Sequence, residues 1–258
     1  IPEYLVLESG DYDGDGRSDL AVFRQENGLW AVRGLGRIYY GVRGDIPVAG
    51  DYNGDGFTDV AIFRPANGMW AVKNLTRFYH GSSSNLPAPA DYDGDGTADP
   101  AVYGRQSGCW AIRGLTRLYF GAEGDKPVPG DYDGDGLSEI AVFRDALGLW
   151  AVRGVTRAYF GRSGDIPVAG KYRWYVSGRS APQFQDTIAV FRPSSALWAI
   201  RGTSRYYFGR SGDRPVRGDF SGGSLDQAAV FRPGTGLWAV RGVTRAYFGA
   251  PGDIPLAR

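Results

Sequence analysis

A sequence unit of about forty residues occurs six times along this chain, and this repeat restricts the possible folds more than any other feature. Six tryptophans mark its rhythm, spaced 40, 40, 40, 48 and 40 residues apart. They are Trp30, Trp70, Trp110, Trp150, Trp198 and Trp238. The units cover residues 11–50, 51–90, 91–130, 131–170, 171–218 and 219–258, and the fifth contains an insertion. Repeats of this length are typical of solenoids and propellers.

Each unit contains four short β-type runs separated by turn residues, which in the fourth unit are residues 139–144, 149–153, 156–161 and 165–170. The inner runs are apolar on both faces, so each small sheet must be covered on both sides. Six sheets stacked radially cover one another. We therefore predict an all-β fold, a six-bladed β-propeller formed as a single domain by residues 1–258, with a linear β-solenoid as the alternative. The sequence leaves open whether residues 1–10 or 254–258 complete the first blade.

Composition excludes several classes of function. The chain has 29 Lys and Arg against 28 Asp and Glu, a formal net charge of +1. Its single histidine, His80, and its single cysteine, Cys109, argue against His-dependent catalysis and Cys-rich metal sites. Because no run of eighteen or more residues is apolar, we expect no membrane insertion. Because no basic run or recognised stacking motif occurs, we also expect no nucleic-acid partner.

The first four units open with the pattern Asp-x-Asp-Gly-Asp-Gly-x-x-Asp, with Asn or Glu at single positions. Oxygen ligands at positions 1, 3, 5 and 9, with a main-chain carbonyl at position 7, suit a hard cation of flexible geometry. Glycines at positions 4 and 6 allow the chain to curl around an ion. The predicted metal ligands are Asp11, Asp13, Asp15, Arg17, Asp19, Asp51, Asn53, Asp55, Phe57, Asp59, Asp91, Asp93, Asp95, Thr97, Asp99, Asp131, Asp133, Asp135, Leu137 and Glu139.

Calcium fits these loops better than magnesium, which keeps several waters and few carboxylates, and zinc lacks its usual His and Cys ligands. The loops are not EF-hands, because position 12 is Val or Ile instead of a bidentate Glu. An acidic turn that serves only solubility is the alternative, although four copies at one spacing disfavour it. Lys171 replaces the first acid of the fifth loop, and the sixth loop has Ser221, Gly223 and Gln227 at positions 3, 5 and 9. We predict four Ca²⁺ ions and two empty loops.

The acidic pattern, together with Phe160-Gly161 and Val168-Ala169-Gly170, resembles the FG-GAP/VCBS repeats known from integrin α-chain propellers and many bacterial surface proteins. The resemblance covers essentially the whole chain. It implies a propeller in which each loop binds calcium between two strands of one blade. Rings of this family usually have seven blades, so six repeats depart from the usual count. The family includes adhesion and glycan-binding modules, and the resemblance does not decide the partner.

Arginines also recur in register, most of them at residues 24, 33 and 37 and their equivalents, and an acid recurs at residue 45 and its equivalents. We expect these residues mostly to pair one blade with the next, although a basic surface could favour an acidic polysaccharide. The repeated aromatic residues are expected mostly in the core. A lectin that presents one Trp face per blade to a sugar is the alternative.

The insertion of the fifth unit breaks the repeat with an aromatic and basic stretch at residues 171–186. Aromatic and Arg side chains on an exposed loop are typical of binding hot spots. The residues predicted to bind a ligand are Tyr172, Arg173, Trp174, Tyr175 and Arg179. The alternative is a decayed calcium loop whose aromatic residues fill the gap.

These observations favour a non-catalytic, calcium-stabilised binding or adhesion module, extracellular or at a cell surface, that recognises a glycan or a cell-surface protein. The alternatives are a propeller-based polysaccharide lyase or hydrolase, and a structural spacer of a larger surface protein. We expect no enzymatic activity, because the sequence shows no spare histidine, no nucleophile elbow and no separate carboxylate pair. The oligomeric state and the identity of the ligand stay open.

Overall fold

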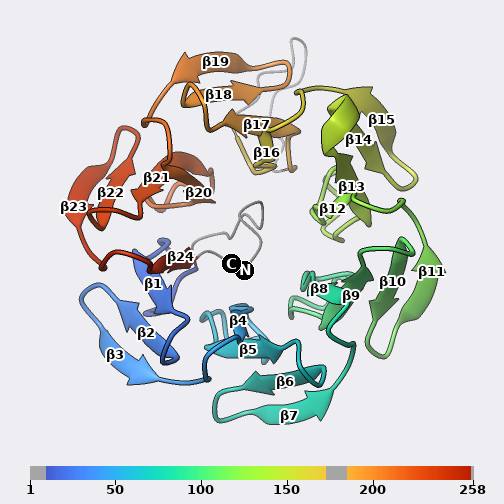
Figure 1. Ribbon diagram of the computed structural model, residues 1–258, viewed down its shortest axis with the longest axis horizontal. Coiled ribbons are helices and arrows are strands. Elements are labelled where there is room, and N and C mark those ends of the chain that lie inside the picture. Colours follow the sequence, from blue (N-terminus) through green and yellow to red (C-terminus); the bar gives the residue numbers. More distant parts are fainter. Residues whose placement is uncertain (1–9, 173–184, 257–258) are drawn as a thin grey trace.

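The computed structural model describes residues 10–172 and 185–256. Their strands form six four-stranded antiparallel sheets, which are arranged as blades around a central axis (Figure 1). In these two segments the one helical element is the short 3₁₀ turn η1 (Asp145–Leu147). The prediction of an all-β, six-bladed propeller is confirmed.

Each blade runs outward from the axis through four strands (Figure 1). From the first blade to the sixth, the innermost strands are β24 (Ile254–Leu256), β4 (Ile46–Pro47), β8 (Asn85–Pro87), β12 (Lys126–Pro127), β16 (Ile166–Pro167) and β20 (Arg214–Gly218). The second strands are β1 (Ala21–Arg24), β5 (Ala61–Arg64), β9 (Ala101–Gly104), β13 (Ala141–Arg144), β17 (Ala189–Arg192) and β21 (Gln227–Arg232). The third strands are β2 (Leu29–Val32), β6 (Met69–Val72), β10 (Cys109–Ile112), β14 (Leu149–Val152), β18 (Leu197–Ile200) and β22 (Leu237–Val240). The outermost strands are β3 (Gly36–Tyr39), β7 (Thr76–Tyr79), β11 (Thr116–Tyr119), β15 (Thr156–Tyr159), β19 (Ser204–Tyr207) and β23 (Thr244–Tyr247).

The blades are offset from the sequence units, because the last run of each unit forms the innermost strand of the following blade. The ring closes by the same rule: β24 pairs antiparallel with β1, with Ile254 opposite Phe23. A main-chain hydrogen bond from the Ser18 amide to the Asp219 carbonyl, 2.7 Å long, also joins the first and last loops. The C-terminal strand therefore completes the first blade.

A buried aromatic pair lies at the centre of every blade. In the first blade Phe23 is opposite Trp30, and both are at most 1% exposed. The indole nitrogen of Trp30 donates a hydrogen bond of 2.9 Å to the carbonyl oxygen of Tyr40. The same bond, from each Trp to the carbonyl ten residues later, occurs in the other five blades. Because all six Trp side chains are buried, the alternative of a lectin that presents a Trp face in every blade is wrong.

The Phe-Gly motif follows from this packing. Gly41, which comes directly after the carbonyl that accepts the indole hydrogen bond, has a φ of +111°. Its carbonyl approaches Gly28 so closely that a Cβ on Gly28 would overlap the oxygen. Glycine at both positions therefore allows the segment after β3 to pass close to the turn between β1 and β2 of the same blade.

The repeated Arg and Asp residues pair within a blade, not between blades as we expected. Arg64, at the end of β5, makes two hydrogen bonds of 2.7 and 2.8 Å to Asp45, which lies directly before β4 of the same sheet. Asp45 is 1% exposed and also accepts a hydrogen bond from the Val42 amide in the turn that enters the blade. Four other blades have the same pair. The third blade has Asn85 and Gly104 at these positions, so both partners are replaced together.

Contacts from blade to blade come from two of the other repeated arginines and from His80. The guanidinium carbon of Arg113, after β10, lies 4.2 Å from the ring centre of Phe78 in β7 of the preceding blade. Arg241 lies 4.0 Å from the ring centre of Tyr206 in the same way. His80 also reaches the next blade, where its Nε2 lies 2.9 Å from the carbonyl oxygen of Ala111. The expected pairing between blades therefore holds for Arg113 and Arg241.

Candidate metal centre

The four acidic loops lie near the axis, at the inner end of their blades. In blades two to four the loop connects the innermost strand to the second, and the main chain closes it between positions 0 and 9. The bridges are Gly50 with Asp59, Ala90 with Asp99 and Gly130 with Glu139. In the first blade the Asp19 amide donates to the Gly10 carbonyl at 2.8 Å. In blades two to four the loops are therefore the turns of tight hairpins, as the repeat predicts.

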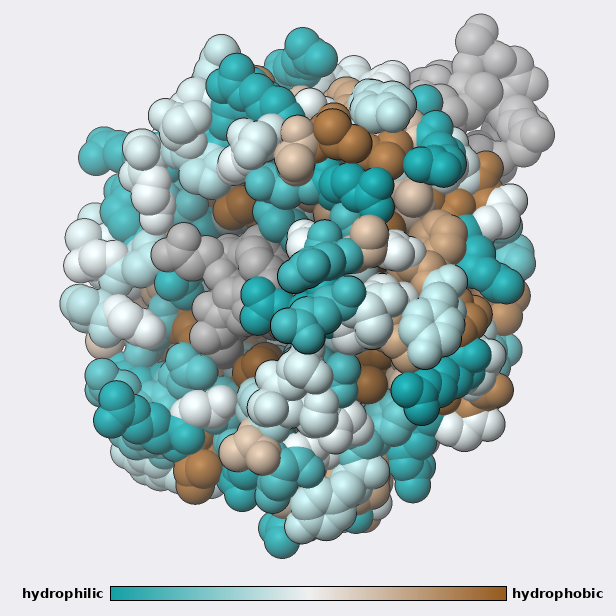
Figure 2. Space-filling view, turned by 45° about the vertical axis from the view of Figure 1, so that its right-hand side comes forward, coloured by the Kyte–Doolittle hydropathy of each residue, from teal (hydrophilic) through white to brown (hydrophobic). Residues whose placement is uncertain are grey.

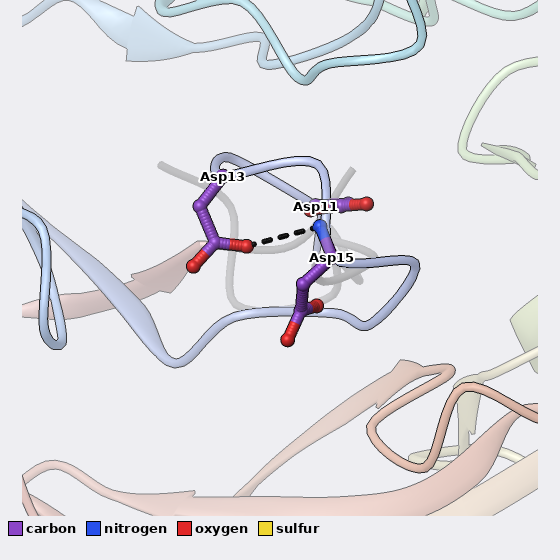
Figure 3. Close-up of side chains that lie close together, drawn as sticks. All are labelled: Asp11, Asp13 and Asp15. Carbon is purple, nitrogen blue, oxygen red and sulfur yellow. Dashed lines mark hydrogen bonds between the residues drawn. The ribbon is translucent and has the colours of Figure 1, made fainter.

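Inside each loop, backbone amides hold the carboxylates. The amides of Gly14 and Gly16 donate to the two oxygens of Asp11 at 2.6 and 2.9 Å. The Asp15 amide donates to Asp13, and Figure 3 shows the three carboxylates of Asp11, Asp13 and Asp15 gathered in one turn. Gly14 and Gly16 have φ values of +77° and +80°, which is the conformation that glycine adopts most readily. The backbone therefore orients the acidic side chains.

Position 9 is folded back onto the same turn. The Asp19 carboxylate accepts a hydrogen bond of 2.8 Å from the Tyr12 amide at position 2 of its loop. Asp59, Asp99 and Glu139 make the equivalent bond. In this way an acid at the end of the loop faces the acids at its start.

The ligand atoms of three loops converge. In each group below, one oxygen per carboxylate lies within 4.8 Å of the others. The groups are Asp11, Asp13 and Asp15; Asp91, Asp93 and Asp99; and Asp131, Asp133 and Glu139. In the second loop Asn53 supplies an amide oxygen where the others have a carboxylate. The carbonyl oxygens at position 7, in Arg17, Phe57, Thr97 and Leu137, remain predicted ligands.

The electrostatics of the loops also fit a cation. Burial, with smaller contributions from the neighbouring loop carboxylates, raises the pKa of Asp19 to about 6. The pKa values of Asp59, Asp99 and Glu139 are raised for the same reason. Within the described segments no Lys or Arg side chain forms an ion pair with Asp11, Asp13 or Asp15. Anionic oxygens held together without a counter-charge are the donor set that a calcium ion requires.

The six loops are linked to one another in a closed belt of main-chain hydrogen bonds. The Thr58 amide, at position 8 of the second loop, donates to the Asp11 carbonyl at position 1 of the first loop. The equivalent bond joins every following loop, and the Ser18 amide closes the belt onto Asp219. This contact could not be predicted from the sequence, although the residue at position 8 is small in the first four loops. Position 1 therefore belongs both to the acidic turn and to the contact with the next blade.

The two loops without the acidic pattern carry a different polar cluster. Asp186 and Asp226 occupy position 8 of the fifth and sixth loops, where the others have Ser, Thr or Ala. Arg217 donates to Asp226 at 2.9 Å and lies 3.8 Å from Asp186. Burial and the charge of Asp226 raise the pKa of Asp186 to about 7. Both acids and Arg217 line a central cavity of about 770 Å³, whose wall includes residues of all six loops.

The structure describes only one of the five residues predicted to bind a ligand in the insertion. Tyr172 is 4% exposed, packs in the core, and donates from its hydroxyl to the Val168 carbonyl at 2.9 Å. This burial replaces the expectation of an exposed binding residue, because Tyr172 makes the same contact as Tyr52 and Tyr92 at position 2 of their loops. The other four lie outside the described residues: Arg173, Trp174, Tyr175 and Arg179.

Comparison with known families gives a match to one blade of the ring. The sequence model of the FG-GAP repeat matches residues 44–79, a segment that contains the strands β4 to β7 of the second blade. The second blade therefore resembles an FG-GAP repeat. With the closed ring of six blades, the match fits an FG-GAP repeat propeller.

Among solved structures, the chain resembles the crystal structure of selenomethionine-substituted virginiamycin B lyase from Staphylococcus aureus. The two are 8% identical with a TM-score of 0.56, over 98% of this chain and 85% of the lyase chain. This likeness is one of fold. No curated protein matches the sequence. Among the described residues no helix is both long and apolar enough to cross a membrane.

Proposed function

We propose that this protein is a calcium-stabilised, non-catalytic binding module that acts outside the cell and recognises a glycan or a cell-surface protein. The convergence of carboxylates in the loops at the inner ends of the blades carries the calcium part of the proposal. FG-GAP repeats are typical of extracellular proteins, where calcium is abundant, and this supports the location. Calcium, when bound, would neutralise the acidic turns and tie position 9 of each loop to positions 1, 3 and 5.

Chelation tests the calcium part directly. Extracellular calcium modules have Kd values on the order of 10⁻⁴ M, so calcium at about 1 mM would stabilise the fold by about 1.4 kcal/mol per site. Four sites would raise the melting temperature by roughly 10 °C or more in a chain of this size. A melting temperature that is equal in calcium and in chelator would contradict this part of the proposal.

A glycan array, read with the wild-type chain and with Trp174→Ala, tests the binding part. Binding that the substitution abolishes would place the partner on the insertion, and binding that survives it would place the partner elsewhere on the ring. Absence of binding to any glycan or candidate surface protein would favour the spacer and contradict the binding module.

A polysaccharide-active enzyme is the second candidate, because one observation favours it. Asp186 and Asp226 lie with Arg217 in the wall of the central cavity, and a carboxyl group whose pKa is raised to about 7 is suited to proton transfer. Turnover of a polysaccharide that is lost in Asp226→Asn, with folding retained, would support the enzyme and contradict the non-catalytic proposal.

A further inference from the structure

The outer wall of the ring, defined here as residues 33–40, 73–80, 113–120, 153–160, 201–208 and 241–248, has an unusual composition. Each of the six segments contains two basic residues and no Asp or Glu. Each contains the outermost strand of its blade together with the turn before it. Most acids lie elsewhere, in the loops near the axis and in the buried Arg–Asp pairs. The outer wall therefore carries 12 of the 29 Lys and Arg residues and none of the 28 Asp and Glu residues.

The same strands expose an aromatic ring in every blade. Tyr39, Tyr79, Tyr119, Tyr159, Tyr207 and Tyr247 are 68–77% exposed, although we expected repeated aromatic residues mostly in the core. Each follows an exposed Arg by two residues, so that Arg and Tyr lie on the same face of the strand. In Figure 2 the visible surface is a mixture of hydrophilic and apolar residues without one continuous apolar area. The rim therefore carries six separate stations, each with a guanidinium and a phenol.

The wall also contains a groove between the third and fourth blades. This hollow of about 510 Å³ has Phe120 on one side and Leu149, Arg153 and Arg157 of the next blade around it. An apolar floor flanked by guanidinium groups fits a sugar ring that bears a negative group, because the ring contacts the floor and the charge pairs with Arg.

Protection of the outermost strands would explain the basic residues, but not the tyrosines. Charged side chains on an edge strand prevent it from pairing with another sheet, and every outermost strand here is such an edge. This role requires no aromatic ring, and an exposed Tyr in all six blades adds apolar surface instead of removing it. Tyr together with Arg is the combination that is enriched at binding surfaces.

We propose that the outer wall binds an anionic polysaccharide, carboxylated or sulfated, through the six Arg–Tyr stations used together. This inference rests on the proposed binding function and names the partner class and the surface. Because the stations are identical in kind, one polymer engages several at once, and avidity multiplies a weak contact at each. Binding is then strong only for a polymer and weakens as salt increases.

The test compares two triple variants that change the charge equally. Arg157→Gln, Arg205→Gln and Arg245→Gln remove three stations, whereas Arg43→Gln, Arg162→Gln and Arg210→Gln remove three exposed arginines from the turns between blades. Hyaluronan supplies carboxylates, dextran sulfate supplies sulfates, and neutral dextran and a single-stranded DNA oligonucleotide are comparison probes. We expect one or both polyanions to bind, with affinity at least about tenfold lower in the wall variant and within about twofold of wild type in the turn variant.

A third variant isolates the aromatic contribution. Tyr159→Thr, Tyr207→Thr and Tyr247→Thr keep the charge and a residue that favours strands, so the melting temperature should stay close to wild type while polyanion affinity falls. Equal losses of polyanion affinity in the wall and turn variants would show that only the net charge matters, and would overturn the inference. Tighter binding of the oligonucleotide than of both polysaccharides would overturn it in favour of nucleic acid. Binding of a neutral glycan that no wall variant alters would overturn it and leave the proposed binding function standing.

Discussion

The arginine that ends the second strand of five blades has a fixed carboxylate partner in the same blade. Arg192 ends β17 and meets Asp165, which lies just before β16, at 2.8 Å. Asp165 is fully buried, so its charge depends on this contact and on the Arg162 amide that it also binds. A buried carboxylate that loses its cation is far more costly than the pair is favourable.

Arg192→Gly should therefore destabilise the protein by about 3 kcal/mol in chemical unfolding. Adding Asp165→Asn should restore at least half of this loss, because the third blade has Asn85 and Gly104 in the same places and the Asn85 side chain accepts a bond from the Ser82 amide. The double-mutant cycle cancels the cost of introducing glycine. Independent, additive effects of the two substitutions would show that the pair is not a unit.

At the scale of elements, the acidic loop and its two flanking strands form the unit whose stability depends on protons and on metal. Raised carboxyl pKa values mean that the metal-free folded chain keeps protons that the unfolded chain has already lost. For Asp19 this interval runs from about 4 to about 6, and for Asp186 it extends to about 7. Across it the free energy of unfolding falls as the pH rises.

In chelator, the melting temperature should therefore be higher at pH 5 than at pH 7. In calcium the difference should shrink or reverse, because the ion stabilises the carboxylates and protons compete with it. Asp19→Asn should weaken the pH dependence measured in chelator. A metal-free melting temperature that rises from pH 5 to pH 7 would mean that the pKa values of these carboxyl groups are not raised in solution.

Elements also show what the sequence could and could not predict. The 40-residue period predicted the blades, the position of the loops and a core formed by most of the repeated aromatic residues. It could not distinguish Phe160, which is partly buried, from Tyr159, which is exposed, since neighbouring blades diverge with distance from the axis and leave one face of each outermost strand uncovered. The period also could not predict that Arg and Asp pair within one blade. The Asp belongs to the end of one sequence unit and the Arg to the next unit, and the two share a blade because blades and units are offset.

The whole molecule is a closed ring, and closure depends on one short strand. β24 covers β1, and Asp253, which directly precedes β24, is the partner of Arg24. Leu256 and Ile254 pack against Phe23, Trp30 and residues of the second blade. The belt of hydrogen bonds between loops closes at the same place, so the first and last blades hold each other by side chains and by main chain.

A chain that ends after Gly252 should lose this closure. It exposes Phe23 and leaves Arg24 without its partner, so we expect a melting temperature lower by more than about 10 °C and a broader transition. A chain that ends after Leu256 keeps β24 and should melt close to the full chain. Equal melting of the two would show that the ring does not depend on its closing strand.

The number of calcium ions bound per folded chain tests the account most directly, and matched substitutions at position 3 of two loops make the count decisive. Calorimetric titration of the metal-free protein should give four sites, and Asp133→Ala should reduce them to three. Ser221→Ala, at the same position of the sixth loop, should leave four, because that loop has no acid at positions 3, 5 and 9. No calcium uptake at millimolar concentration, or a count that Asp133→Ala does not change, would contradict the central claim that the acidic hairpins around the axis are calcium sites.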